Sequence, residues 1–309
     1  MIRYLIKNNF KIMMRSGVNI LLYIVCPVLV SAVLISAFSS LMENYKPDEE
    51  FMAKYGAIEA NFEDQVNDNQ TNFADQTNAD QSEDADQANG MTSSFNISAI
   101  NIEHPYFVPA IDSTDYYGII EVVYFGWCAI VCISGLLSSE KKNRINDKLY
   151  VSNLSVTQIY LARLIPLSIT CALGVSIAAV IGMVFMGVHW GNLVLSAIVV
   201  ILMIFAASAF EMMLYEITNS MLVTIIVSFA IVWIWGFFGG SFETYMFSPH
   251  SMTLKNIDPI YHGNRALVEL SCMGHSDYVL SSVIYSVLMI VVCSIVAVFA
   301  GNIRRRKGA

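Results

Sequence analysis

Few residues in this sequence have the types and spacing that catalysis requires. The sequence has no Gly-Lys pair, which a phosphate-binding loop needs, and neither H-E-x-x-H nor G-x-S-x-G occurs. We therefore expect no ATPase or hydrolase activity in this chain, and no catalytic, cofactor-binding or metal-binding residues. The five histidines have no metal-ligand spacing, so we expect separate surface residues rather than ligands. They are His104, His189, His250, His262 and His275.

One stretch, Ser138 to Pro166, has the residue types that contact another protein. It combines mixed charges with an apolar stripe, and we expect it to be helical, although a loop of this length need not be. We expect its charged residues to orient docking of a soluble partner and its apolar residues to fill a groove on that partner. The residues predicted for this contact are Glu140, Lys141, Lys142, Arg144, Ile145 and Leu149.

The N-terminal stretch MIRYLIKNNFKIMMRS has a cation every four residues, from Arg3 to Arg15. On a helix this spacing makes one cationic stripe, and apolar side chains cover much of the rest. Such a helix would lie in the membrane interface and attract anionic lipid. The alternative is an ordinary basic flank without an interfacial helix.

The elements that carry these residues are long and apolar. The chain is 56% hydrophobic and only 14% charged, whereas a soluble chain has about 25% charged residues. Six runs have roughly the 20 apolar residues that cross ~30 Å of hydrocarbon as a helix. They predict an all-α integral membrane protein with transmembrane helices over 17–42, 116–138, 164–190, 192–210, 220–238 and 278–301.

The basic residues predict the orientation of these spans. Thirteen of the 17 lysines and arginines lie before span one, between spans two and three, or after span six. The positive-inside rule makes that side cytoplasmic, which places both termini inside. The predicted cytoplasmic segments are an elbow helix (1–16), a coupling loop (139–163), a short loop with Glu211 and Glu216, and a basic tail (302–309).

The predicted outer side has two segments, a small acidic loop domain (43–115) and a re-entrant segment (239–277). The loop contains an 11-residue repeat over 61–89, whose low hydrophobicity and high charge favour disorder. We expect a tolerated expansion, with a calcium-binding acidic repeat as the functional alternative. Within span three, Gly174, Ala178 and Gly182 place small residues on one face, which favours close helix packing.

In this order, the segments resemble the membrane permeases of type-2 ATP-binding-cassette (ABC) exporters. Such permeases have an elbow helix, an outer domain after span one and a coupling helix after span two. The positions that are similar to the family's coupling loop are Glu140, Lys141, Leu149, Ser152, Ser155, Ile159, Leu161, Arg163 and Pro166, and DPIYHGNRAL resembles its stretch before the last span. The sequence departs from the family pattern at Arg144-Ile145 and at Asn153.

The resemblance implies a permease subunit in the plasma membrane that transports without catalysing. Its implied partners are a cytosolic ABC ATPase, which binds ATP and Mg²⁺, and a second permease copy or paralogue, within membrane lipid and without nucleic acid. Because few ionisable residues enter the spans, we expect an amphipathic or hydrophobic substrate. The alternative function is an ATPase-independent channel or a membrane-anchored scaffold.

Overall fold

The computed structural model describes residues 2–44, 113–145, 148–149, 154–242 and 252–306. The predicted outer loop, its acidic repeat and part of the coupling loop lie outside these residues. By its contacts the chain forms two units, and nearly all described residues belong to the larger one, Met1–Ser39 and Pro105–Ala309. This larger unit contains the helical bundle.

The regular secondary structure of the described residues is helical, with no strand among them. Their order is α1 (Ile2–Met14), α2 (Gly17–Ile20), a π-helical turn η1 (Leu21–Val25), α3 (Cys26–Asn44), α5 (Ser113–Gly126), α6 (Ala129–Lys142), α8 (Val156–Ile181), a π-helical turn η3 (Gly182–Met186), α9 (Leu193–Thr218), α10 (Met221–Phe238), α11 (Met252–Ile257), α12 (Pro259–Met273) and α13 (Tyr278–Arg306).

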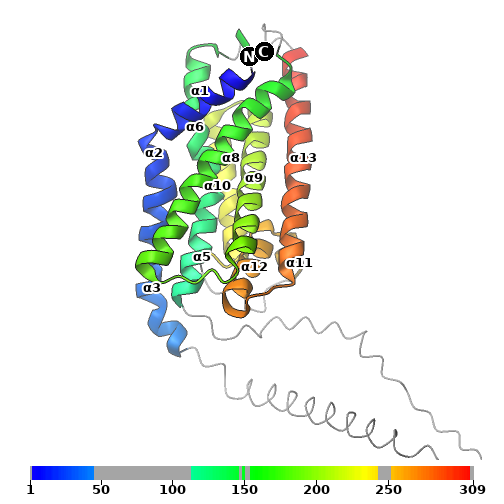
Figure 1. The fold of residues 1–309 in the computed structure, drawn as a ribbon. Helices are drawn as coiled ribbons and strands as arrows, with labels where there is room; N and C mark the ends of the chain where they lie inside the picture. The colour runs from blue at the N-terminus through cyan, green and yellow to red at the C-terminus, as the bar shows by residue number, and fades with distance from the viewer. Residues whose placement is uncertain (1, 45–112, 146–147, 150–153, 243–251, 307–309) are drawn as a thin grey trace, which may run out of the picture. The chain divides into compact units, whose positions relative to one another are not determined.

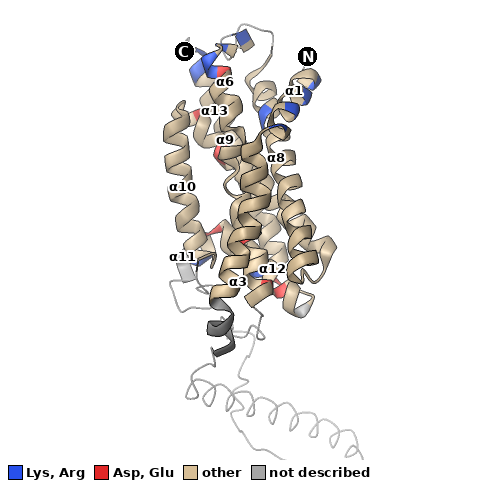
Figure 2. Ribbon diagram, turned by 90° about the vertical axis from the view of Figure 1, so that its left-hand side faces the viewer, with Lys and Arg blue, Asp and Glu red and all other residues tan. Residues whose placement is uncertain are grey.

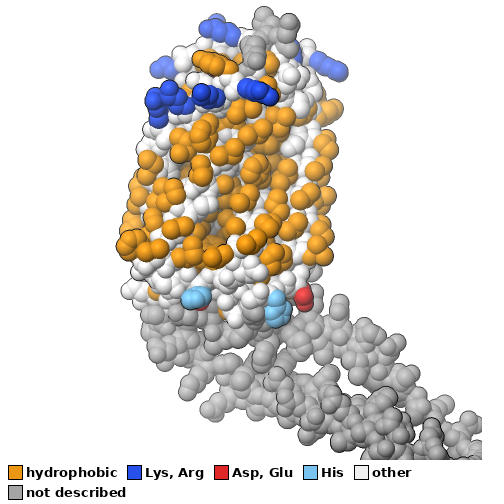
Figure 3. Space-filling view, in the orientation of Figure 1, with side chains coloured by type: hydrophobic (Ala, Val, Ile, Leu, Met, Phe, Trp, Pro, Cys, Tyr) orange, Lys and Arg blue, Asp and Glu red, His pale blue; other side chains and the backbone are white. Residues whose placement is uncertain are grey.

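These helices form an upright bundle with both termini at one end (Figure 1). Six helical segments of the described chain are long and apolar enough to cross a membrane, which confirms the six-span all-α prediction. On the face shown in Figure 3, apolar side chains cover the bundle in a belt that lysine and arginine side chains bound at one end. Figure 2 places these cations near α1, α6 and the end of α13. We call this end, which holds both termini, the basic end.

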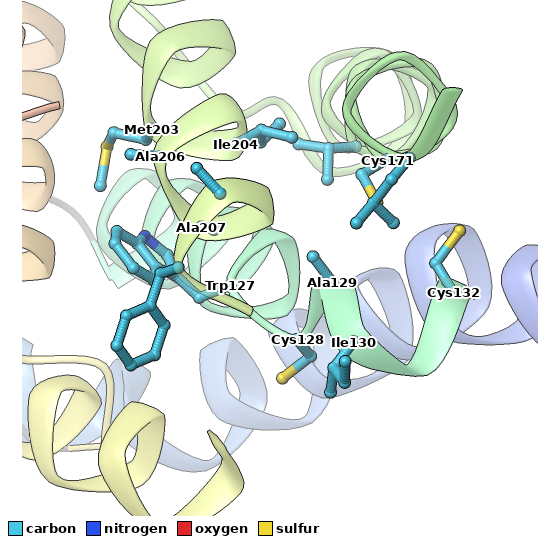
Figure 4. Packing of buried hydrophobic residues seen from close by; sticks show 14 of the residues in the cluster. Trp127, Cys128, Ala129, Ile130, Cys132, Cys171, Met203, Ile204, Ala206 and Ala207 are labelled. Carbon is cyan, nitrogen blue, oxygen red and sulfur yellow. The ribbon is translucent and has the colours of Figure 1, made fainter. Parts of the chain in front are cut away.

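Helix α9 lies at the centre, where it packs against α5, α6, α8, α10, α12 and α13. Its small residues let these neighbours approach, as Figure 4 shows where Trp127 lies beside Ala206 and Ala207. Both alanines are fully buried. Lipid tails are as apolar as the helices, so the hydrophobic effect does not drive helix packing in a membrane. Small side chains let the helices approach closely, and van der Waals contacts then hold them together.

Span boundaries differ from the sequence prediction at the basic end. Helix α8 begins at Val156 rather than at 164, and α9 continues to Thr218 rather than ending at 210. Glu211 and Glu216 therefore lie in a helix and are buried, not in a short loop. Hydropathy sets a span's end at the first charge, whereas here the charged residues are paired or enclosed inside the bundle.

Candidate coupling site at the basic end

Four charged side chains from four helices meet at the basic end. The Arg163 guanidinium on α8 contacts Glu140 of α6, with 2.6 Å between Nη2 and Oε2, and Glu216 of α9, with 3.3 Å between Nη1 and Oε1. Arg304 of α13 approaches the same Glu216, with 3.0 Å between Nη1 and Oε2. Its second terminal nitrogen donates to the Glu216 carbonyl oxygen. We call these four residues the ion network.

The ion network is enclosed by protein. Arg163 is 2% exposed and Glu140 is 3% exposed. Two acids face two bases, so each charge has an opposite charge beside it. Removing one member would leave a charge buried without compensation, which costs about 3–5 kcal/mol. The network therefore makes the positions of α6, α8, α9 and α13 at this end depend on one another.

A proline explains how α1 attaches beside the network. Pro166 lies inside α8 and has no N–H, so the carbonyl of Ala162 lacks its usual helical donor. The side-chain amide of Asn9, on α1, donates to that carbonyl oxygen over 3.0 Å. Asn9 is 1% exposed. The elbow helix is thus tied to α8 one residue before Arg163.

A small apolar cluster ties the coupling segment to the same elbow helix. Leu149, Leu154 and Ile159 are buried together, and Leu5 of α1 and Ile145 pack against them. Leu5 and Asn9 are four residues apart on α1, so they lie on one face of it. Apolar contacts and the Asn9 hydrogen bond therefore both hold α1 against the start of α8.

The start of α8 has a clear local cause. The Ser155 hydroxyl accepts from the Gln158 N–H, and the Gln158 side chain accepts from the Ser155 N–H, which together form a capping box. The predicted coupling loop (139–163) is therefore shorter than expected, because its last eight residues are helical. The signal was present in the sequence as a serine followed three residues later by glutamine.

The residues predicted to dock a partner divide into two groups. Lys141, Lys142 and Arg144 are exposed at the end of α6 and just beyond it. Arg144 has φ +51°, the left-handed turn that ends this helix. Glu140 and Leu149 instead turn inward, to the ion network and the apolar cluster, and Ile145 is partly buried. Contact of this surface with an ATPase stays a prediction.

Sequence reasoning missed two members of the ion network. Glu216 was expected in a short loop and Arg304 in a free basic tail. A single sequence gives no signal that joins them, because they are 88 residues apart and meet only when α9 packs on α13. Arg305 is also engaged, since it donates to the Leu154 carbonyl over 2.9 Å.

The small residues of span three differ in how closely they are approached. A Cβ added at Gly174 would lie 2.6 Å from the Tyr23 Cβ, which is closer than atoms allow. At Gly182 it would meet a Val188 methyl at 3.5 Å, an ordinary contact. Ala178 is fully buried. A side chain at position 174 would therefore clash with span one, whereas a methyl group at position 182 would make an ordinary contact.

The opposite end of the bundle contains a second polar cluster, on α11 and α12. Arg265 donates to Glu269 over 2.7 Å and to the Tyr261 hydroxyl over 3.0 Å. His262 was expected at the surface, but it is 7% exposed and its ring stacks on Tyr285, 4.2 Å between centroids. Helix α12 packs between α5, α9, α10 and α13, so its polar face is enclosed by the bundle.

Burial sets the ionisation of this second cluster. It lowers the pKa of His262, although the Asn256 carbonyl partly opposes this. It also lowers the pKa of Lys255, with a further contribution from the Arg265 cation. The pKa of Asp258 is raised well above its usual value by burial, against the N–H groups of Ile260 and Tyr261. Burial thus shifts the pKa of each of these three groups in the direction of its neutral form.

Fold and site together define a multi-pass membrane protein whose helices are joined by ion pairs at one end. A family model described as ABC-2 family transporter protein matches residues 48–299. The match covers most of the chain, so the chain belongs to this family of ABC permeases, which are transport components rather than enzymes. The chain matches no curated protein and no solved structure.

Proposed function

We propose that this chain is the permease subunit of an exporter for an amphipathic or hydrophobic substrate, powered by a separate ATP-binding subunit. The observation that carries the proposal is the ion network directly behind an exposed cationic surface. Lys142, at the end of α6, is exposed to solvent. Two residues earlier on the same helix, Glu140 forms an ion pair with Arg163. A force on this surface therefore acts on α8, α9 and α13 through paired charges.

The proposed docking surface consists of Lys141, Lys142 and Arg144. Three adjacent exposed cations favour an acidic groove on the partner, since opposite charges speed encounter and fix orientation. Lys141 also donates to the Asn219 carbonyl over 3.3 Å, which connects this surface to the end of α9. ATP and Mg²⁺ would bind to the partner subunit, not to this chain.

The remaining parts of the proposal concern the assembly and its placement. By the positive-inside rule, the basic end faces the cytoplasm, where ATP is available. The spans α3, α10 and α13 expose apolar side chains outward, among them Leu29, Leu222 and Leu288. These faces suit lipid and a second permease copy or paralogue. A plasma-membrane location follows from the export function.

The experiment compares removal of two docking cations with removal of one tail cation. The double variant carries Lys142→Gln and Arg144→Asn, which removes both charges. Asparagine tolerates the left-handed conformation that residue 144 adopts. Arg306→Gln removes an exposed cation elsewhere at the basic end. We expect the double variant to lose most copurifying ATPase and ATP-driven transport, while its level in the membrane stays normal.

The control variant should keep both properties. If the double variant retains its ATPase and its transport, the docking surface is wrong. If the wild-type chain copurifies with no ATPase and moves solute without ATP, the channel or scaffold alternative holds instead.

A further inference from the structure

Span two, Ser113–Lys142, is broken near its middle. Helix α5 ends at Gly126 and α6 begins at Ala129, and the turn between them is tighter than an α-helix. The Cys128 N–H donates to Phe125 over 3.1 Å, three residues back. The Tyr23 hydroxyl donates to the Cys128 carbonyl over 3.1 Å. Irregular backbone at membrane depth occurs where protein encloses it, and broken spans frequently form binding sites.

Two buried carboxyl groups lie on the helices around this break. Glu121 on α5 is 2% exposed, and Glu211 on α9 is not exposed. Within the described chain, Oε1 of Glu121 and both carboxyl oxygens of Glu211 have no hydrogen-bond partner. The thiol of Cys128, in the break itself, lies within electrostatic range of both groups. Glu121 already lay within predicted span two, and Glu211 adds an ionisable group that the sequence analysis had placed in a loop.

Other buried polar groups near the break also lack partners in the described chain. They are the Trp127 indole N–H and the Ser208 hydroxyl, which lies three residues before Glu211 on α9. The Ser228 hydroxyl on α10 lies close to the Glu211 carboxyl. Unpaired polar groups are expensive at this depth and mark substrate or ion sites.

We propose that this region, the break site (Glu121, Trp127, Cys128, Glu211 and Ser228), binds the ammonium group of an amphipathic organic cation. The Glu211 carboxyl, whose two oxygens have no hydrogen-bond partner in the described chain, can accept hydrogen bonds from an ammonium, which is a donor without acceptor capacity. This inference rests on the proposed function and names the charge of its substrate.

Aromatic rings beside the break support a cation of this kind. The Trp127 ring contacts that of Trp235 with centroids 5.5 Å apart, and Phe210 contacts Trp235 with centroids 4.9 Å apart. The rings offer faces to a cation and apolar surface to its alkyl chain. In Figure 4 Trp127 lies against α9 at Ala206 and Ala207, one to two turns from Glu211.

Helix α10 provides the access. Only a narrow stripe of this helix is buried, namely Thr224, Ser228, Val232 and Gly236. Most of its other side chains face outward, so a small displacement of α10 from α9 uncovers Glu211. A carboxyl group buried without a counter-ion is held neutral, because an unpaired charge in hydrocarbon is costly. The arriving ammonium then displaces one carboxyl proton, and the net charge of the site does not change.

The test uses the purified chain in lipid nanodiscs without any ATP-binding subunit. A hydrophobic carbodiimide modifies neutral carboxyl groups within membranes, and mass spectrometry reports its addition at Glu211. We expect dodecylammonium to reduce this modification by about fivefold or more, which corresponds to roughly 1 kcal/mol of binding preference. Dodecanol, with the same chain and no charge, should not protect, and neither should sodium chloride at equal ionic strength.

Each other outcome contradicts the proposal. Equal protection by dodecanol would mean that the region recognises only the alkyl chain, and protection by sodium would make it an inorganic cation site. Absence of modification at Glu211 under every condition would show that α10 never uncovers it. The ATPase is absent from this assay, so a failure of the proposed function leaves its result unaffected.

Discussion

The ion network predicts a specific pattern of stabilities. Arg163→Met leaves the Glu140 carboxylate, 3% exposed, without its cation, whereas Glu216 keeps Arg304. Losing one partner of a buried pair costs about 3–5 kcal/mol. In the double variant Glu140→Gln with Arg163→Met no uncompensated charge remains. We therefore expect the double variant to be more stable than Arg163→Met alone, with a coupling energy of about 1–3 kcal/mol.

The measurement is the free energy of unfolding of the purified chain, titrated with a denaturing detergent in mixed micelles. The four corners of the cycle are wild type, each single variant and the double variant. Arg306→Met is the matched control, because that arginine is exposed at the same end, and it should change stability by less than about 0.5 kcal/mol. Additive single effects, with no coupling, would refute the network's structural role.

Three further predictions test other parts of the structure. Gly174→Ala should destabilise the chain by about 1–3 kcal/mol, whereas Gly182→Ala should be nearly neutral, as checked by the same unfolding titration. Because burial lowers the pKa of His262, its contribution to stability is present above pH 6.5 and is lost as pH falls below that value; His262→Gln should flatten this acid-side decline. Deleting residues 61–89 should leave membrane insertion and transport near wild-type levels; lost transport with normal insertion would instead assign the acidic repeat a role in handling cations or cargo.

Hydropathy predicted the six spans because each must present about 20 apolar residues to lipid, whatever its neighbours. It failed at the ends of the spans. Glu140 and Arg163 were assigned to a loop, since a charge reads as a boundary when its partner is unknown. Glu211 shows the same failure inside the bundle, because burial by α10 depends on packing between helices and not on the composition of α9.

The sequence also did not predict which segments contact one another. The stripe of Ile145 and Leu149 was correctly recognised as apolar, but an apolar stripe does not state what covers it. In the structure Leu5 of the elbow helix covers it. The consequence of Pro166 for Ala162 was inferable in principle, whereas the identity of the donor was not, since Asn9 lies 153 residues away.

The contacts of the elbow helix and of the ion network determine which helices an ATP-binding partner would move. A flexible loop that docked through Leu149 would transmit force only through its own ends. Here the elbow helix, the coupling segment and the start of α8 are joined by the apolar cluster and by the Asn9 hydrogen bond. The same end of α8 holds Arg163, which is paired with α6 and α9.

On the proposed function, a force applied at Lys142 therefore acts on several packed helices at once. Packed helices respond to such a force by discrete rearrangement rather than by gradual bending. Helix α10 has no member in the ion network and buries only one narrow stripe, so it can move relative to these helices without breaking a charged pair of the network.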